Sequence, residues 1–261
     1  MPVAGNGRMP AVFVGHGNPM NAITETPYAH AWKALGAALP RPRAIVVVSA
    51  HWYVRGTAVT AMPKPRTIHD FGRFPKALFD VQYPAPGDPA LAAEIAALLA
   101  PTPVRLDSSW GLDHAAWSVL VHAYPNADVP VVELAIDANK TPREHFEIGR
   151  TLAQLRERNV LVMGSGNIVH NLNYIDFSGK AAPHDWAVRF DEYVAAALTA
   201  RDDEALIDYA RAPDAALAAP DIEHFLPVLY IAGTRRPDDG LRFLVEGIDA
   251  ASASMRAFQV G

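Results

Sequence analysis

Short, unbroken hydrophobic runs alternate along the chain with longer segments whose apolar residues recur at helical spacing. The clearest runs are apolar on both faces, and they occupy Ala11–Val14, Ile45–Val48, Val129–Ile136 and Val160–Met163. Runs of this kind predict strands that are buried on both sides, as at the centre of a parallel sheet. Weaker patterns predict short strands at Thr57–Met62, Val104–Leu106 and Leu241–Val245.

Helix signals fall between these runs. Asp88 followed by Pro89 predicts a helix start, with the aspartate as N-cap and the proline at the first helical position. Thr141-Pro142-Arg143-Glu144 is a capping box, and its helix is predicted to run to about Arg158. Asp113 is a candidate N-cap for a helix through Tyr124. Further helical spacing is found at Pro27–Leu39, Ala187–Ala200 and Glu204–Ala210.

Because strands alternate with helices, we predict one α/β domain spanning residues 1–261, with a central, mostly parallel sheet covered by helices on both faces. Ligands bind beyond the carboxyl ends of the strands in such sheets. Two stretches interrupt the pattern. Pro63–Pro75 is irregular, and a loop of this length is usually functional or mobile. Pro227 leaves open the boundary of the segment that begins at Asp221.

Composition narrows the classes of function. The 261 residues carry a net charge of −5 with both signs mixed along the chain, so no basic footprint for nucleic acid or an anionic membrane is present. The absence of cysteine excludes disulfides, thiolate metal sites and a cysteine nucleophile. Residues 1–10 lack the apolar core of a signal peptide and no apolar run is long enough to span a bilayer, so we expect a cytoplasmic protein.

Three of the ten histidines lie where predicted strands end. His16 follows the first run between two glycines, His51 closes the run that starts at Ile45, and His170 follows the glycine-containing turn after Met163. Each histidine alone is more often a solvated or hydrogen-bonded group than a ligand. Because parallel strands bring their carboxyl ends to one edge, the three are expected to converge there. Imidazole is the commonest transition-metal ligand, so together they predict a metal site.

Other histidines have weaker signals. Glu223-His224 offers two further ligand types side by side, although a carboxylate also suits the first turn of a helix. His114 is a candidate first-turn residue near two tryptophans, and His69-Asp70 can be read as an ordinary loop ion pair. Trp52 is interpreted as core or pocket wall. Four histidines beside helices are interpreted as lying on solvated faces: His30, His122, His145 and His184.

Several common catalytic motifs are missing. No phosphate-binding P-loop or dinucleotide fingerprint is present, and Gly164-Ser165-Gly166 is too short for a phosphate loop and lacks a matching acidic partner. No Gly-x-Ser-x-Gly elbow occurs, which argues against a serine hydrolase.

An ordered set of short motifs covers nearly the whole chain. The set comprises Gly15-His16-Gly17-Asn18-Pro19-Met20, Ser49-Ala50-His51-Trp52, Ile68-His69-Asp70-Phe71-Gly72, Trp110-Gly111-Leu112-Asp113-His114, Gly164-Ser165-Gly166-Asn167 with His170-Asn171, and Glu223-His224-Phe225-Leu226-Pro227. As an ordered set it resembles the class III extradiol ring-cleavage dioxygenases, most closely their 4,5-DOPA dioxygenase branch. The resemblance implies an enzyme that opens a catechol ring beside its hydroxyl groups, using O2 and non-haem Fe(II).

The resemblance also implies roles for single residues. His16 and His51 would be metal ligands, and His224 the third, although the wider superfamily often places a glutamate there and Glu223 adjoins it. His170 would be the acid/base, or a fourth ligand if the site holds Zn(II). His114 would act on substrate in the pocket, which His69, Asp70 and Trp52 would also line. Arg73 stands where the family often has a glycine, which bears on the loop over the pocket.

Two other functions remain open at this point. A zinc-dependent hydrolase would use the same histidines with an activated water, since imidazole suits both metals. A non-catalytic metal-binding protein of the same fold would keep the histidines without turnover. The physiological catechol is not readable, although Arg73, Lys76 or Arg66 can be considered as partners of a substrate carboxylate. Monomer and homodimer are both compatible with the sequence.

Overall fold

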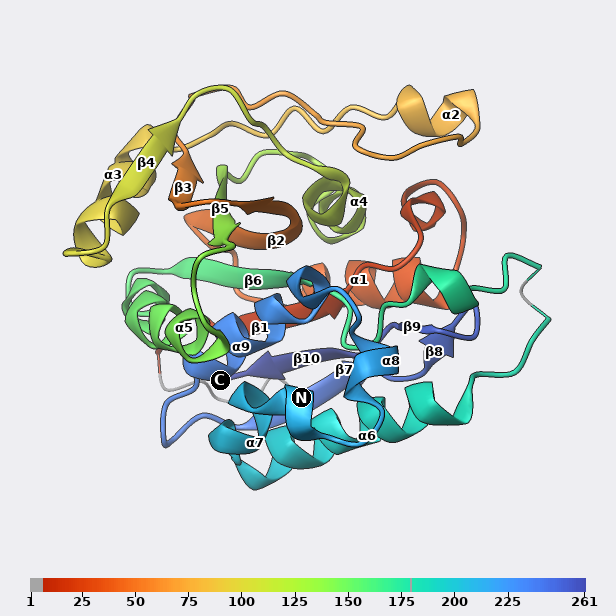
Figure 1. Cartoon of the computed structure of the whole chain (residues 1–261). Coiled ribbons are helices and arrows are strands. Elements are labelled where there is room, and N and C mark those ends of the chain that lie inside the picture. Colours follow the sequence, from red (N-terminus) through yellow and green to blue (C-terminus); the bar gives the residue numbers. More distant parts are fainter. Residues whose placement is uncertain (1–6, 179) are drawn as a thin grey trace.

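A computed structural model describes residues 7–178 and 180–261 of the chain. Its main sheet has the strand order β4-β3-β5-β2-β6-β1-β10-β7 (Figure 1). The four central strands run parallel to one another: β5 (Val131–Asp137), β2 (Ala44–Val54), β6 (Val160–Gly166) and β1 (Ala11–Gly15). The sheet is therefore mostly parallel at its centre, as predicted.

Antiparallel pairs flank the parallel centre. On one side β3 (Thr57–Thr60) is antiparallel to β5, and β4 (Val104–Asp107) is parallel to β3. On the other side β10 (Ala257–Val260) is antiparallel to β1, and β7 (Leu241–Val245) is antiparallel to β10. The short strands β8 (Ile248–Asp249) and β9 (Ala253–Ser254) form a separate two-stranded sheet.

Helices cover both faces of the main sheet. The first face packs against α3 (Pro89–Leu98), α5 (Pro142–Arg156), α6 (Asp185–Ala200) and α9 (Leu226–Gly233). The second packs against α1 (Pro27–Ala38) and α4 (His114–Ala123). Shorter elements complete the described chain: α2 (Lys76–Phe79), α7 (Asp203–Ile207), α8 (Ala215–Ala218), and the 3₁₀ turns η1 (Pro19–Ala22), η2 (Leu172–Tyr174), η3 (Tyr209–Arg211) and η4 (Ile222–His224).

The two-sided burial explains the unbroken hydrophobic runs. In β1, Phe13 belongs to the cluster under α5 and α9, whereas Val12 belongs to the cluster under α1 and α4. In β2, Val46 and Val47 divide between the same two clusters. Successive side chains of a strand point to opposite faces, so a strand covered on both sides has to be apolar throughout.

The predicted helix caps are confirmed. The Asp88 side chain accepts a hydrogen bond from the backbone N–H of Leu91 at 2.9 Å, and α3 begins at Pro89. Thr141 and Glu144 form the reciprocal capping box at the start of α5. The Asp113 side chain accepts from the backbone of Ala116, so α4 begins at His114. These caps are local in sequence and could therefore be predicted without knowledge of the tertiary structure.

Strand β2 is longer than predicted. It continues beyond His51 to Val54, so this histidine does not close the strand. Pairing with β6 ends at Ser49, and the register with β5 shifts between Val48 and Tyr53. His51 therefore lies where the ladder is interrupted, an arrangement that re-aims side chains at sheet edges and beside functional sites.

Strand β6 runs through Gly164-Ser165-Gly166, which was predicted to be a turn. A side chain at Gly166 would collide with the backbone carbonyl oxygen of His224, and one at Gly164 would crowd Pro227. The two glycines thus allow η4 and the start of α9 to pack directly on the strand. The backbone N–H of Asn167 then donates to the His224 carbonyl at 2.9 Å.

The C-terminal part of the sheet was predicted incompletely. The strand at Leu241–Val245 is confirmed as β7, but β10 follows it and lies between β7 and β1. Four residues with a single glutamine among them carry little periodic signal, and their place beside the first strand depends on contacts far apart in the sequence.

A buried ion pair connects this region to α5. The Arg156 side chain is fully buried, and its Nη1 donates to Asp239 Oδ2 at 2.5 Å and to the Thr234 carbonyl at 2.8 Å. Its Nε donates to the Met9 carbonyl at 2.8 Å, and Nη2 donates to the Val260 carbonyl at 3.4 Å. One guanidinium thus joins segments that precede β1, follow α9 and form β10.

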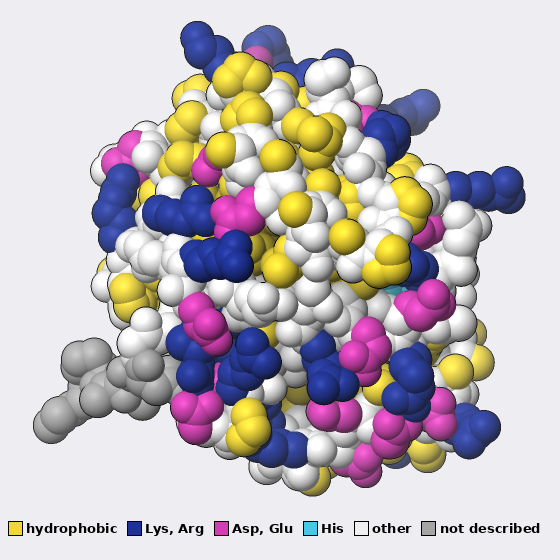
Figure 2. Space-filling model, turned by 90° about the vertical axis from the view of Figure 1, so that its left-hand side faces the viewer, with side chains coloured by type: hydrophobic (Ala, Val, Ile, Leu, Met, Phe, Trp, Pro, Cys, Tyr) yellow, Lys and Arg dark blue, Asp and Glu magenta, His cyan; other side chains and the backbone are white. Residues whose placement is uncertain are grey.

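The outer surface agrees with the mixed charge of the sequence. On the face in Figure 2, Lys and Arg side chains are interspersed with Asp and Glu. Among the described residues, no helix combines the length and the apolar character that crossing a membrane requires.

Candidate metal centre

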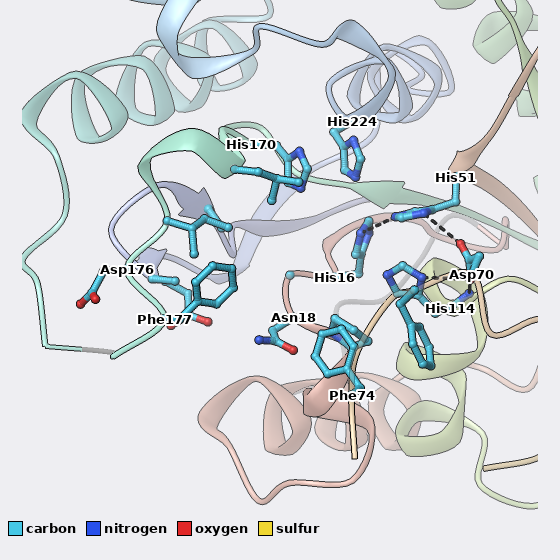
Figure 3. Close-up of a pocket in the computed structure, with 18 residues that line it drawn as sticks. His16, Asn18, His51, Asp70, Phe74, His114, His170, Asp176, Phe177 and His224 are labelled. Atoms are coloured by element: carbon cyan, nitrogen blue, oxygen red, sulfur yellow. Dashed lines mark hydrogen bonds and ion pairs between the residues drawn. The ribbon is translucent and has the colours of Figure 1, made fainter. Parts of the chain in front are cut away.

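Four histidines meet at the carboxyl edge of the parallel strands. His16 follows β1, His51 belongs to β2, His170 follows β6, and His224 closes η4. All four line one cavity of about 470 Å³ (Figure 3). Sheet topology brings them together because β6, the strand before His170, lies between β1 and β2.

Hydrogen bonding assigns the proton of the His16 ring. The Ser165 hydroxyl donates to the backbone carbonyl of Ala115 at 2.6 Å, which uses its only hydrogen. His16 Nδ1 lies 3.2 Å from the same hydroxyl oxygen, so Nδ1 carries the proton and donates it. In the neutral ring Nε2 is then a bare lone pair. The central residue of the Gly164-Ser165-Gly166 motif therefore orients His16.

His51 is oriented by a carboxylate. Its Nδ1 lies 2.9 Å from Asp70 Oδ2, and a carboxylate can only accept, so this nitrogen also carries the proton. His51 Nε2 faces His16 Nε2 at 3.3 Å. Although burial opposes protonation, the hydrogen bond with Asp70 raises the pKa of His51. A metal ion bound between the two Nε2 atoms would therefore displace a proton from His51.

His224 repeats the arrangement. Its Nδ1 lies 3.3 Å from Glu223 Oε1, which leaves Nε2 as the free nitrogen. That atom is buried and has no hydrogen-bond partner among the described residues. A buried polar atom is normally paired, so an unpaired one needs a partner that the polypeptide does not provide. Glu223 acts here as the acceptor that orients the histidine.

The three rings form a group that fits a metal ion. One ligand atom from each of His16, His51 and His224 lies within 4.8 Å of the others. Burial lowers the pKa of His16 and of His224 well below the ordinary value, which keeps both rings neutral and able to coordinate. Each Nδ1 contacts a carboxylate or hydroxyl behind the ring, as metal-binding histidines commonly do. The donor set suits Fe(II) and Zn(II) alike.

Asp70 joins the metal group to a fourth ring. Its Oδ1 lies 3.0 Å from His114 Nδ1 and accepts from the His114 backbone N–H at 2.9 Å. Although burial opposes ionisation, contacts with His114 and His51 lower the pKa of Asp70, so it is an anion. The long loop around Asp70 therefore delivers one carboxylate to two histidines. The anticipated pairing of Asp70 with His69 does not occur.

His170 lies beside the group of three. Its ring stacks on that of His224, with centroids 3.6 Å apart and planes at 7°. Burial, together with His224, lowers the pKa of His170 to about 2, so the ring is neutral at pH 7. Stacking thus places the His170 ring beside the metal-binding candidates, but His170 does not belong to the group formed by His16, His51 and His224.

Two predicted pocket residues are not brought to the cavity. Trp52 is buried on the other side of β2, where its ring stacks on Trp110 at a centroid distance of 5.4 Å. His69 Nε2 lies 2.9 Å from the Val81 carbonyl, and its ring packs near Trp117. The apolar cavity wall comes instead from residues that sequence reasoning did not single out: Phe71, Phe74, Leu172, Ile175 and Phe177.

His145 corrects another interpretation. It was assigned to a solvated helix face, but its side chain is fully buried and its Nδ1 lies 2.8 Å from the Tyr230 hydroxyl. Burial lowers the pKa of His145 to about 4. The residue is a neutral core group that links α5 to α9.

A buried carboxyl pair supports the start of α4. Glu133 of β5 is fully buried, accepting from the Asp113 backbone N–H at 2.8 Å and from Trp110 Nε1 at 3.0 Å. Asp113 in turn accepts from the Ser49 hydroxyl at 2.7 Å. Burial, reinforced by the charge of Asp113, raises the pKa of Glu133 well above its usual 4.5. Glu133 is therefore protonated where the unfolded chain is ionised.

This pair predicts a pH-dependent effect of Glu133→Gln. A raised folded-state pKa means that folded protein holds a proton which unfolded chain releases above about pH 4.5, so Glu133 destabilises the fold as the pH rises. Gln cannot ionise, so the variant should not lose stability in this way. The difference in free energy of unfolding, variant minus parent, should therefore increase between pH 5 and 8. Urea denaturation across this range measures the gain. Exposed Glu147→Gln is the control, and an equal slope in both variants would contradict the assignment.

Comparison with known proteins adds independent information. Residues 10–248 match the family model described as the catalytic LigB subunit of aromatic ring-opening dioxygenase. A protein of Escherichia coli (strain K12) named 4,5-DOPA dioxygenase extradiol is 50% identical over 258 residues, covering 97% of this chain and 95% of the relative. A protein of Beta vulgaris with the same name is 38% identical over 229 residues, covering 84% of each chain.

A solved structure is similar as well. The crystal structure of an uncharacterized protein from Escherichia coli K12 superimposes with a TM-score of 0.87 at 46% sequence identity. The match covers 97% of this chain and 100% of the other. The similarity therefore extends over both faces of the sheet and the histidine cavity.

Proposed function

Because the chain belongs to the family of the catalytic LigB subunit of aromatic ring-opening dioxygenases, we propose that it is an extradiol dioxygenase that opens a DOPA-like catechol with O2 at a non-haem Fe(II) site. We assign His16, His51 and His224 as the metal ligands. The observation that supports this set is the convergence of one ring nitrogen from each of the three histidines, together with the buried, unpartnered Nε2 of His224. Asp70, Ser165 and Glu223 hold the three rings from behind.

The metal ion and the residues of the cavity would have different roles in the reaction. Fe(II) held by three imidazoles would supply neighbouring open positions for both catechol oxygens and O2, and would favour loss of the catechol protons. The apolar wall with Phe71 and Phe74 holds the aromatic ring and excludes water around it. Asp70, anionic and shared by two histidines, keeps His51 and His114 in fixed orientations.

Two histidines outside the ligand set act on protons. His170 lines the cavity as a neutral ring, so it can accept a hydrogen bond from a catechol hydroxyl. Because burial and His224 lower its pKa, transfer of the proton to His170 requires the negative charge of a bound catecholate beside it. His114 commits Nδ1 to Asp70, which leaves Nε2 as the polar atom available to the substrate. We assign His170 as the acid/base and His114 as a hydrogen-bonding partner of the substrate.

His170→Ala is expected to lower kcat by about 10²- to 10⁴-fold while the iron content stays near that of the parent, because the variant loses a proton acceptor and no ligand. Oxygen uptake and metal analysis of the same sample measure the two quantities. Unchanged turnover in the iron-loaded variant would remove His170 from the mechanism, and loss of iron would make it a ligand. The same test applies to His114→Ala.

The reaction itself is tested by anaerobic reconstitution with Fe(II), followed by addition of air-saturated buffer and a small panel of catechols that includes DOPA. We expect oxygen consumption together with a coloured, ring-opened semialdehyde. Absence of uptake with iron verifiably bound would contradict the dioxygenase assignment.

A zinc-dependent hydrolase is the second candidate, since three imidazole ligands are also a standard catalytic zinc set. Finding zinc in a purified sample would not distinguish the hydrolase from the dioxygenase, because Zn(II) outcompetes Fe(II) by intrinsic affinity. Dependence of turnover on O2 does discriminate, because hydrolysis requires none.

A further inference from the structure

Among the described residues, the cavity that contains the histidines is lined by acidic side chains but by no Lys or Arg. Its charged lining residues besides the histidines are Asp70, Asp176 and Asp249. The three basic residues considered as partners of a substrate carboxylate are elsewhere: Arg66 donates to the Trp110 carbonyl, Lys76 pairs with Asp80, and exposed Arg73 does not line the cavity.

Two of the three carboxylates are already engaged. Asp70 is held between His51 and His114. Asp176 accepts hydrogen bonds from its own loop, from the backbone N–H groups of Ser178, Lys180 and Ala181 and from the Ser178 hydroxyl. In Figure 3 its carboxylate points away from the histidines. Asp176 therefore shapes the loop that carries the apolar wall.

The carboxylate of Asp249 is different. The residue is partly buried and lines the cavity, and its side chain has no hydrogen-bond or ion-pair partner within the described ranges. Its charge acts on a neighbouring phenol, since burial and then Asp249 raise the pKa of Tyr28. An anion that is partly withdrawn from water and lacks a counter-charge attracts a cationic ligand group.

Backbone pairing relates Asp249 to the histidines. Asp249 pairs with Ala253 across β8 and β9, and Ala253 forms a bridge with His170. Two antiparallel spacings of about 5 Å each place the Asp249 backbone roughly 10 Å from that of His170. This span is comparable to a catechol ring that carries a two-carbon amine. A catechol whose hydroxyl groups face the histidines thus extends its substituent toward Asp249.

We propose that Asp249 is a specificity-determining residue that selects catechols with a cationic ammonium substituent over catechols with an anionic one. This inference rests on the proposed function for the placement of the catechol hydroxyls. For a substrate such as DOPA, Asp249 recognises the ammonium group, and no Lys or Arg among the described lining residues pairs with the carboxylate of the substrate. The cavity thereby favours a primary amine on the side chain and does not require an acid.

Three catechols that share the ring and differ in charge test the proposal: dopamine, neutral 4-ethylcatechol, and anionic 3-(3,4-dihydroxyphenyl)propionate. We expect kcat/KM to fall in this order, with the cation favoured over the anion by about tenfold or more. Asp249→Asn, which keeps the shape and removes the charge, should bring the cation-to-anion ratio close to one. Asp249→Glu should retain the preference.

Asp208→Asn is the matched control, because it removes one negative charge at an exposed position that contacts only Arg211 by an ion pair and lies outside the cavity. Its cation-to-anion ratio should equal that of the parent. Equal kcat/KM for the cation and the anion in the parent, or a preference that survives Asp249→Asn, would overturn the proposal.

Dissociation constants of the same three catechols, measured without O2, test the role of Asp249 independently of the dioxygenase assignment. If none of them is cleaved but dopamine binds with a preference that Asp249→Asn abolishes, the dioxygenase assignment fails and the role of Asp249 stands. If all are cleaved and bound without regard to charge, the assignment stands and the role of Asp249 fails.

Discussion

His224→Ala is expected to remove the metal from the protein and to lower catechol turnover by about 10³-fold or more. Loss of an orienting group behind a ligand typically costs about 10- to 100-fold in metal affinity, and loss of the ligand itself costs more. The variant also leaves the facing Nε2 atoms of His16 and His51 without the third donor that completes the site. Metal content after Fe(II) reconstitution and oxygen uptake measure the effect.

Two further variants make this result specific. His30→Ala removes an exposed histidine that pairs with Glu25, and it should keep full metal content and turnover. Glu223→Gln should weaken metal binding by about 10- to 100-fold, since it changes only the group behind His224. If Glu223→Gln lost the metal and His224→Ala kept it, the carboxylate would be the third ligand.

Arg156→Ala is expected to lower the free energy of unfolding by about 3–5 kcal/mol, because it leaves the carboxylate of Asp239 without its main buried partner. It also removes the donors to three backbone carbonyl groups, those of Met9, Thr234 and Val260. Urea denaturation of the metal-free protein gives the free energy without a contribution from metal binding.

Arg158→Ala is the matched control for this prediction. Arg158 lies two residues away on the surface, where it pairs with Glu94, and exposed pairs contribute about 0–1 kcal/mol. A loss in Arg156→Ala no larger than in Arg158→Ala would contradict the view that the buried guanidinium holds the C-terminal segment in place.

The parts of the fold that could be predicted from sequence are those set by local or two-sided patterns. The parallel centre follows from runs that are apolar on both faces, such as Ile45–Val48, and helix starts follow from caps such as Asp88 and Thr141. The position of β10 depends on pairing with β1, which is remote in sequence. Strand β6 contains two glycines because η4 and the start of α9 pack closely against it. In the sequence alone, the same two glycines suggested a turn rather than a continuing strand.

The site divides in the same way. A chain without cysteine and with few histidines at strand ends restricts the candidate ligands to a short list, so His16, His51 and His170 could be named in advance. His224 was one of two adjacent candidates, and only the family resemblance favoured it over Glu223. The cavity walls could not, because they are assembled from separate loops. One error was avoidable: neighbouring residues of a strand point to opposite faces, so a strand that directs His51 into the cavity directs Trp52 away from it.

The position of β10 beside β1 has a consequence for the order in which the sheet assembles during folding. Strands β1 and β10 are far apart in the sequence, so one edge of β1 stays unpaired until residues 257–260 fold onto it. A folding intermediate in which β10 has not docked therefore exposes an open strand edge next to His16, which is a site for chaperone binding or for aggregation. Completion of the sheet on this side of β1, and with it a settled position for His16, therefore requires β10 to dock.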